Sequence, residues 1–149
     1  IRRRWEEGDL QWGYRRCNLH EGTRIVVRCA LRLSPSNSAE VGERIRSAMV
    51  RRRRQPLGRK TAGSVFKNPK GLFAGALLEG CGCKGMSCGG ARVSEIHANF
   101  IENDKNATGE DIIALIRECR RRVKETYGVL LELEVQVWGD APEEALGIY

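Results

Sequence analysis

The chain has 149 residues, of which 41% are apolar and 30% are charged, and its formal net charge is +7. This composition is typical of one soluble, folded domain and excludes a disordered chain. No apolar run approaches the roughly 20 residues that cross a bilayer as a helix. The first ten residues, IRRRWEEGDL, lack an initial methionine and the apolar core of a signal peptide. We therefore expect a cytoplasmic protein, in the form of a piece of a longer polypeptide, with no membrane partner.

The first part of the chain predicts one strand and one helix. Apolar residues alternate with arginines over residues 23–33, TRIVVRCALRL, which indicates a half-buried strand. A helix is expected over about 39–53, and Asn37, three residues before Glu40, is expected to cap its first turn. The apolar face of this helix is expected to point inward and comprises Val41, Ile45, Ala48 and Met49.

The middle of the chain is rich in glycine. Residues 55–63, QPLGRKTAG, are expected to form a loop. The segment 71–80 predicts a short helix that ends at Gly80. The inward residues of that helix are expected to be Phe73, Leu77 and Leu78. The following ARVSEIHANFIEN, residues 91–103, predicts two short strands.

The last part predicts a long helix and a strand. Thr108 and Asp111 form a capping-box pattern before the helix, and Gly128 is expected to end it. Its apolar stripe comprises Ile112, Leu115, Ile116, Cys119 and Val123. Residues 129–138 alternate as a strand, and 140–149 are expected to be a loose tail. Strands and helices without a regular βαβ rhythm predict an α+β fold with a mixed sheet packed against helices.

Six cysteines stand at positions 17, 29, 81, 83, 88 and 119. Cys29 and Cys119 fall on expected apolar faces, where reduced cysteine acts as a small hydrophobe. The cluster CGCKGMSC, even with His97 as a fourth ligand, lacks the paired Cys-x-x-Cys spacing of zinc sites. We therefore expect neither a disulfide framework nor a metal site.

Basic residues gather at 2–4 and 44–54. Such clusters are found in nucleic-acid-binding proteins, on solvated helix faces, and in sites where arginine forks bind phosphate or carboxylate. Aromatic residues make up only 6% of the chain and do not alternate with the arginines, so stacking platforms for bases are lacking. We expect no nucleic-acid partner.

One serine stands in an unusual setting. Ser64, in TAGSVFKNPKGLFAG, has no acidic residue or histidine within ten residues on either side. The Gly-x-Ser-x-Gly pattern of hydrolases is also absent around it, so a Ser-His hydrolase is disfavoured. From the residues alone, the simplest interpretation is a hydroxyl that satisfies the backbone of a loop.

Three segments together carry a specific resemblance. QPLGRKTAGSVFKNP, GCKGMSCGGARVSEIHANFIEN and YGVLLELEVQVWG, in this order and spacing, resemble UDP-N-acetylenolpyruvoylglucosamine reductase, also called UDP-N-acetylmuramate dehydrogenase. This family of flavoenzymes makes UDP-N-acetylmuramate for bacterial peptidoglycan. The resemblance extends over roughly residues 12–139.

The resemblance implies a domain organisation. Residues 1–33 would be the end of the FAD-binding domain, and 34–139 the substrate-binding C-terminal domain. The family's enzymes are about twice as long, and the glycine-rich segments with which they hold FAD have no counterpart here. A separate or missing flavin-binding segment is therefore expected as a partner, and FAD and NADPH as cofactors.

The resemblance also implies three catalytic residues. In the family reaction NADPH reduces FAD, hydride passes to the enolpyruvyl double bond, and the neighbouring carbon must receive a proton. Ser64 matches the proton donor, a role that needs position more than a perturbed pKa. Arg15 matches the active-site arginine of a Tyr-Arg-x-Ser pattern, here with Cys17 last, and is expected to hold negative charge on the substrate. Glu134 in LELEV matches the catalytic glutamate, which would bind the carboxylate region when protonated or orient Arg15.

Binding residues follow from the same resemblance. The expected contacts to the UDP-sugar are Asn68, Gln55, His97 and one of Arg51 or Arg52. Tyr14 and Arg15 are expected to contribute to cofactor binding. Two positions depart from the family pattern, because Ile96 stands where lysine is common and Gln136 where arginine often follows. Gln136 removes a positive charge beside Glu134, which is expected to lower substrate affinity.

Each of these residues also has a structural interpretation. Glu134 suits the solvent face of a strand, Arg15 a surface charge, and His97 a hydrogen-bonded structural imidazole. The alternative to a reductase is a non-catalytic module that binds a UDP-sugar or another anion without the flavin domain.

Overall fold

A computed structural model describes residues 3–20 and 24–137. The chain divides into two compact units, Ile1–Val41 and Gly42–Tyr149. The expected tail 140–149 and Trp138 lie outside the described residues. The division of the chain at residue 33 into parts of two domains stays a prediction.

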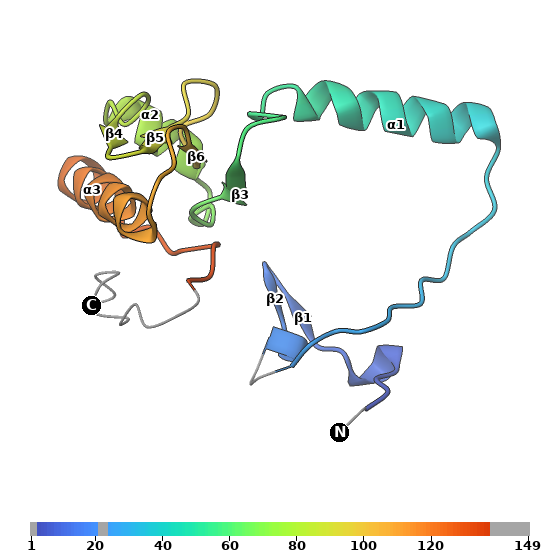
Figure 1. The fold of residues 1–149 in the computed structure, drawn as a ribbon. Helices are drawn as coiled ribbons and strands as arrows, with labels where there is room; N and C mark the ends of the chain where they lie inside the picture. Colours follow the sequence, from blue (N-terminus) through green and yellow to red (C-terminus); the bar gives the residue numbers. More distant parts are fainter. Residues whose placement is uncertain (1–2, 21–23, 138–149) are drawn as a thin grey trace. The chain divides into compact units, whose positions relative to one another are not determined.

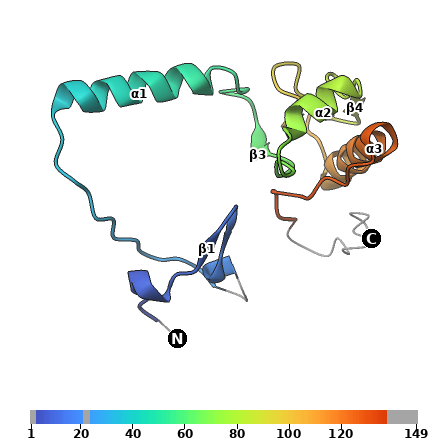
Figure 2. The ribbon, with the colours of Figure 1, turned by 180° about the vertical axis from the view of Figure 1, so that it is seen from behind.

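The first unit contains a small hairpin. Its elements are η1 Glu7–Asp9, β1 Trp12–Gly13, β2 Arg16–Cys17 and η2 Asn18–His20. The strands β1 and β2 pair antiparallel and form the blue hairpin in Figure 2. Tyr14 and Arg15 form the turn between them. The Asn18 side chain donates to the carbonyl of Asp9 at 2.8 Å and accepts from the N–H of Gln11 at 3.2 Å. These two hydrogen bonds tie the base of the hairpin to η1.

The strand predicted over residues 23–33 is wrong. Residues 24–37 form no helix or strand, and Cys29 is exposed. The apolar side chains of the segment are 77–84% exposed at Ile25, Val27, Leu31 and Leu33. Alternation produces a strand only where a neighbouring strand takes up the backbone hydrogen bonds and another layer covers the apolar face. No residue of the described ranges pairs with this segment in a sheet.

The helix α1, Ser38–Arg52, begins as predicted. Asn37 caps it, because its Oδ1 accepts from the N–H of Glu40 at 2.8 Å. The predicted inward face is wrong, because no residue of α1 is buried and Val41, Ile45 and Met49 are 42–61% exposed. Periodicity identifies the apolar side of a helix, but that side is buried only where another element packs on it.

The second unit is built on a four-stranded antiparallel sheet of strand order β3-β6-β5-β4 (Figure 1). The strands are β3 Thr61–Ser64, β4 Ser87–Cys88, β5 Ala91–Val93 and β6 Phe100–Asn103. Helix α3, Gly109–Tyr127, packs against β4 and β5 and also contacts α2, Ala74–Gly80. The α+β class is confirmed, as are the two short strands predicted within 91–103. The predicted mixed sheet is wrong in one respect, because the strand pairs of this sheet in the described residues are all antiparallel.

Helix α3 begins and ends at the predicted residues. Thr108 Oγ1 accepts from the N–H of Asp111 at 3.1 Å, and Asp111 accepts in return from the N–H of Thr108 at 2.9 Å. Gly128 ends the helix with a left-handed φ of 68°. Asp111 also accepts from the N–H of Gly90 at 3.2 Å, which ties the β4–β5 turn to the start of α3. The N–H donors of Thr108 and Gly90 lower the pKa of the Asp111 carboxyl.

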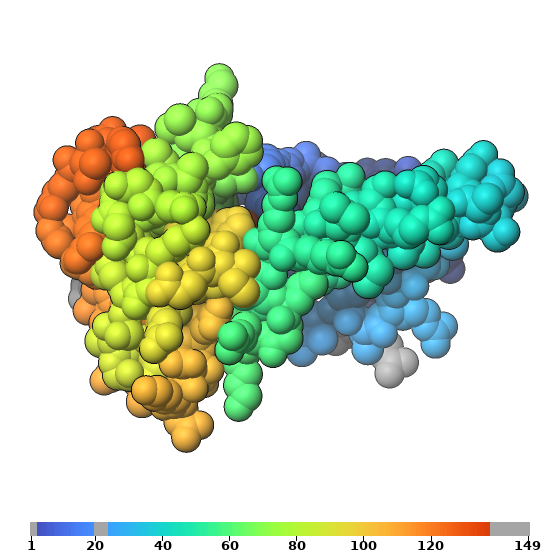
Figure 3. Space-filling model, turned by 90° about the horizontal axis from the view of Figure 1, so that it is seen from above, coloured from blue at the N-terminus to red at the C-terminus, as the bar shows by residue number. Residues whose placement is uncertain are grey.

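The core of this unit lies between the sheet, α2 and α3. Its largest fully buried side chains are Phe66, Leu78, Ile116, Leu131, Val93 and Val123. The space-filling view shows the residues of α3, in orange, directly against the yellow-green residues of the 74–90 region (Figure 3). Cys119 is buried as predicted, whereas Phe73 is 73% exposed. The prediction for Phe73 is wrong because α2 begins only at Ala74, which leaves Phe73 outside the buried helical face.

The predicted strand over residues 129–138 is reduced to one bridge. Leu133 pairs antiparallel with Phe66, and no further strand is formed over the described residues 129–137. The predicted alternation partly holds, since Leu131 is buried and Leu133 is half-buried while Glu132 between them is exposed.

In the part of the chain that is described, no helix is long and apolar enough to cross a membrane. Residues 3–20 and 24–137 contain no group of three or more side chains able to hold a metal ion.

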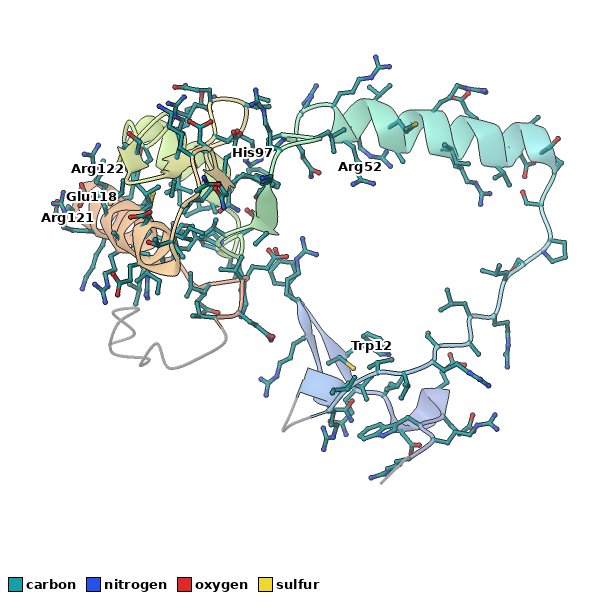
Figure 4. The ribbon with its side chains drawn as sticks, in the orientation of Figure 1. Trp12, Arg52, His97, Glu118, Arg121 and Arg122 are labelled. Carbon is teal, nitrogen blue, oxygen red and sulfur yellow. The ribbon has the colours of Figure 1, made fainter. Side chains whose placement is uncertain are left out.

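A cluster of charged side chains on α3 contacts the loop that follows α2, at Gly82. Glu118 accepts from Arg121 at 2.7 and 2.8 Å and from Arg122 at 2.7 Å, and Figure 4 shows the three side chains together. Arg122 also donates to the carbonyl of Gly82 at 3.5 Å. The bonds from Arg121 and then Arg122 lower the pKa of Glu118 from 4.5 to about 2.

The cluster predicts a loss of stability in acid. Because the folded pKa of Glu118 is depressed, its contribution is fully present above pH 4.5 and is lost as the pH falls toward 2. The effect is small, since these side chains are partly exposed and salt screens them. Urea unfolding followed by circular dichroism should show a shallower decline for Glu118→Gln than for the parent between pH 5 and 2. In a background carrying Arg121→Gln and Arg122→Gln, the same change at Glu118 should have no effect, and an equal effect there would contradict the assignment.

Candidate functional site

Ser64 stands at the end of β3, just after a bulge. Thr61 lies opposite Glu102 and Ser64 opposite Phe100, so β3 carries one residue more than β6 between these pairs. Gly63 has a φ of +95°, and its N–H donates to Thr61 Oγ1 at 3.2 Å. A Cβ at Gly63 would meet nothing within 4 Å, so the backbone conformation, and not space, requires glycine here. Bulges of this kind redirect the next side chain, which here is Ser64.

One edge of the segment after Ser64 is bound by Asn99. The N–H of Val65 donates to the Asn99 carbonyl at 2.9 Å. The Asn99 side chain accepts from the N–H of Phe66 at 2.9 Å and donates to the carbonyl of Phe66 at 2.8 Å. Val65 and Phe66 are both buried, so the segment is anchored in the core although it directly follows the half-buried Ser64.

The other edge of the segment is bound by residues 132–135. The Val65 carbonyl accepts from the N–H of Glu134 at 2.8 Å, and the N–H of Lys67 donates to the Glu132 carbonyl at 2.8 Å. Glu134 is therefore paired with Val65, the residue that follows Ser64. Ser64 and Glu134 are both half-buried. The structure thus brings the backbones of Ser64 and Glu134 near each other, although they are 70 positions apart in the sequence.

Asn68 and Lys67 continue the same segment. Asn68 is exposed, and its Oδ1 accepts from the N–H of Ala74 at 3.0 Å, so the side chain caps the first turn of α2. Lys67 forms an ion pair with Glu132 at 3.2 Å. The structure thus gives Asn68 a structural hydrogen bond, and a contact to a ligand stays a prediction.

His97 lies between β5 and β6. Its Nδ1 accepts from the N–H of Asn99 at 3.2 Å, and its ring meets Phe100 edge-on with centroids 5.0 Å apart. The ring covers Gly75 of α2 so closely that a Cβ there would lie 2.7 Å from His97 Cε1. Burial, followed by the charge of Lys84, lowers the pKa of His97 below 6.5. Because this pKa lies below 6.5, the imidazole is mostly neutral at neutral pH. The bond that Nδ1 accepts from Asn99 assigns its proton to Nε2.

The other positions expected to bind the UDP-sugar lie at or near the surface. Arg51 and Arg52 occupy the last turn of α1 and are exposed, as is Gln55 in the loop that follows. The two departures from the family pattern, Ile96 and Gln136, are also exposed. Their role in binding the substrate stays a prediction.

Arg15 and Tyr14 belong to the first unit. They form the turn of the β1–β2 hairpin, where Arg15 has a left-handed φ of 56°. A residue other than glycine rarely adopts this conformation, and such positions are concentrated at functional sites. The Arg15 guanidinium lies 5.9 Å from the centroid of the Tyr14 ring. These two residues belong to the first unit, whereas Ser64 and Glu134 belong to the second. A shared site of the four residues therefore stays a prediction.

Sequence reasoning missed Asn99. It is 4% exposed, and its carboxamide forms hydrogen bonds with Phe66, which stands 33 residues earlier in the chain. A signal was present, because Asn99 stands between Ala98 and Phe100 at the start of an apolar strand. A carboxamide buried there needs specific partners for its donors and acceptor.

Comparison with known proteins places this geometry in a family. The C-terminal domain of UDP-N-acetylenolpyruvoylglucosamine reductase matches residues 55–138, which is more than half of the chain. The chain belongs to the UDP-N-acetylenolpyruvoylglucosamine reductase family. The matched residues include Ser64, Asn99 and Glu134, and the resemblance inferred from the sequence is confirmed.

Family members of known sequence and structure agree with this assignment. The chain is 46% identical to the reductase of Anaeromyxobacter dehalogenans over 92% of its own length and 42% of that protein. It is 47% identical to the reductase of Moorella thermoacetica over 91% and 45%. The crystal structure of the Thermus caldophilus reductase matches 89% of this chain and 47% of that one, with a TM-score of 0.76 and 39% identity. This family member therefore spans less than half the length of the relatives it matches.

The packing of His97 predicts its titration. The folded pKa lies below 6.5, so the contribution of His97 to stability is present above pH 6.5 and is lost as the pH falls. Proton NMR of the His97 ring signals should give a midpoint below 6.5, and Gly75→Ala, which displaces the ring, should raise it. A parent midpoint at or above 6.5, or an unchanged midpoint in Gly75→Ala, would contradict the described packing.

Proposed function

We propose that this chain contributes the substrate domain, residues 34–139, to a flavin-dependent reductase. The reductase would convert UDP-N-acetylglucosamine enolpyruvate to UDP-N-acetylmuramate with NADPH, in peptidoglycan precursor synthesis in the cytoplasm. The proposal rests on membership of the reductase family together with one structural observation. That observation is the antiparallel bridge in which the N–H of Glu134 donates to the carbonyl of Val65, directly after Ser64.

Ser64 would supply the proton that the substrate requires. After hydride transfer to the enolpyruvyl double bond, the neighbouring carbon is strongly basic and can take a proton from a hydroxyl held in line with it. This role needs no neighbouring base, which agrees with the sequence around Ser64. The bulge at Gly63 supports it, because it fixes the backbone from which the hydroxyl projects.

Glu134 and Arg15 would act on the carboxylate of the same substrate. A protonated Glu134 can donate a hydrogen bond to the carboxylate, and a guanidinium can stabilise the negative charge that develops there. The left-handed backbone of Arg15 at the tip of an exposed hairpin supports a functional role for this residue.

The family's cofactor can be tested against the residues present. The hairpin turn carries an exposed aromatic ring and a guanidinium beside it, a pair suited to a flat, anionic group. Tyr14 and Arg15 would thus hold one part of FAD, and the main binding surface would lie in a flavin-binding segment outside this chain. Bound FAD would supply the hydride that it receives from NADPH.

The UDP part of the substrate would be bound by side chains around α1 and α2. Arg51 or Arg52 would pair with the diphosphate, and Gln55, Asn68 and His97 would donate hydrogen bonds. The neutral His97 has an Nε2–H available as a donor, because its Nδ1 already accepts from Asn99. No nucleic acid or membrane is part of this proposal.

The catalytic role of Ser64 predicts a selective defect. In the full-length polypeptide that carries these residues, Ser64→Ala should slow reoxidation of the reduced flavin by substrate about 10²- to 10⁴-fold. Reduction of the flavin by NADPH should stay within about twofold of the parent, because that half-reaction needs no proton from Ser64. Stopped-flow absorbance measures both steps separately.

A matched control is Ser87→Ala. Ser87 is an exposed serine in strand β4 of the same sheet, and its removal should leave both steps unchanged. Equal reoxidation rates for Ser64→Ala and Ser87→Ala would remove Ser64 from the mechanism and overturn the proposed function.

A non-catalytic UDP-sugar-binding module is the second candidate. It is favoured by the location of Ser64, Asn68, His97 and Glu134 within one unit. Calorimetry of the purified 149-residue chain with UDP-N-acetylglucosamine should show binding that Arg51→Gln and Arg52→Gln together weaken about tenfold, since they remove the expected diphosphate contact. Binding without retained flavin would establish the module, and no binding would confine substrate recognition to the full-length polypeptide.

A further inference from the structure

The buried side chain of Asn99 binds the segment that directly follows Ser64 and that pairs with Glu134 on its other edge. Its carboxamide makes two hydrogen bonds to Phe66, one to the N–H and one to the carbonyl, at 2.9 and 2.8 Å. Its backbone carbonyl accepts from the N–H of Val65 at 2.9 Å. Its own N–H donates to His97 Nδ1. These four hydrogen bonds therefore join Asn99 to the segment after Ser64 and to His97.

The Asn99 side chain takes the place of a strand residue. Regular pairing between β3 and β6 ends at Ser64 and Phe100. Beyond this pair, the carboxamide offers an acceptor and a donor to one residue, Phe66, as a neighbouring strand would. The opposite edge of Val65–Phe66 pairs with residues 132–135. The position of Glu134 relative to Ser64 therefore depends on a segment that Asn99 holds from the other side.

We propose that Asn99 is a positioning residue, whose carboxamide sets the register between Ser64 and Glu134. This inference rests on the proposed function, because it takes these two residues as the groups that act on the substrate. Asn99 itself touches no reacting atom and acts through the backbone of Val65 and Phe66.

The chemistry of the contact explains why an asparagine is needed. An aliphatic side chain of similar size would leave the N–H and the carbonyl of Phe66 buried without partners. An ionised carboxylate would accept from the N–H but face the carbonyl with a second acceptor. A carboxamide of this length satisfies both groups at once, at a residue that is 4% exposed.

The decisive measurement is the rate of flavin reoxidation at saturating substrate, in the full-length polypeptide. Asn99→Ala should lower this rate about 10- to 100-fold, the loss expected when reacting groups shift by about 1 Å. Flavin reduction by NADPH and the KM for the UDP-sugar should change by less than about threefold, because the shift concerns the proton donor. Each rate is divided by the concentration of folded protein with bound flavin. A variant that is only less stable then shows the same rate as the parent.

The matched control is Asn103→Ala. Asn103 ends β6, is half-buried, and accepts from the N–H of Ala107 at 2.9 Å, so its removal also costs a structural hydrogen bond. Its contact lies before α3 and away from the segment after Ser64. Asn103→Ala should therefore destabilise the fold and leave the reoxidation rate within about threefold of the parent.

Asn99→Asp gives a second test if Asn99→Ala does not fold. A neutral aspartic acid can donate to the Phe66 carbonyl and accept from its N–H, whereas the ionised form cannot donate. Burial favours the neutral form, so the reoxidation rate relative to the parent should rise as the pH falls. The titratable groups around this position, His97, Glu134, Lys67 and Glu132, are present in both proteins and affect both rates.

The outcomes separate the two hypotheses. If Ser64→Ala abolishes reoxidation and Asn99→Ala behaves like Asn103→Ala, the positioning role is wrong and the proposed function stands. If Asn99→Asp has the pH dependence of the parent, the positioning role is wrong as well. If Ser64→Ala reoxidises like the parent, the proposed function fails, and the inference drawn from it fails too.

Discussion

The arrangement of the candidate site depends on the backbone of Val65 and Phe66, which is hydrogen-bonded on both edges. One edge binds Asn99 at the start of β6, and the other binds the 132–135 segment. These three regions are far apart in the sequence, so bringing them together lowers the conformational entropy of the chain. Local hydrogen bonds within each region do not compensate for this loss. Burial of both Val65 and Phe66 in the main core offsets this cost. The same burial that stabilises the fold therefore fixes the backbone beside Ser64.

This segment departs from regular strand geometry in a way that suits a site. A regular strand places successive side chains on opposite faces, yet Val65 and Phe66 are both buried. The bulge at Gly63 and the carboxamide of Asn99 replace the regular ladder on either side of Ser64. Ser64 is thus held by neighbours that are anchored in the core while it remains half-buried itself. A reacting hydroxyl needs this combination of fixed position and access.

The sequence predicted best the elements whose signals are local. Thr108, Asp111 and Gly128 mark the limits of α3 because the capping groups lie within three residues of the bonds they make. The segment 24–33 and the apolar face of α1 were predicted wrongly, because their patterns say which side is apolar and not what covers it. The proximity of Ser64 and Glu134 is a non-local pairing that no spacing rule reveals, so only the family resemblance pointed to both. Asn99 was missed because its partner lies 33 residues away.

The groups that fix this site carry no charge at neutral pH. They are backbone amides, the Asn99 carboxamide and the imidazole of His97, whose pKa is lowered by burial. The Lys67–Glu132 ion pair lies beside this segment, and the cluster of Glu118 with Arg121 and Arg122 lies on α3. A framework of backbone amides and a carboxamide keeps its geometry as the pH changes around neutrality, because these groups do not titrate there. A hydroxyl that works by position and not by titration requires such a framework, so the neutral contacts of Val65, Phe66 and Asn99 agree with the role proposed for Ser64.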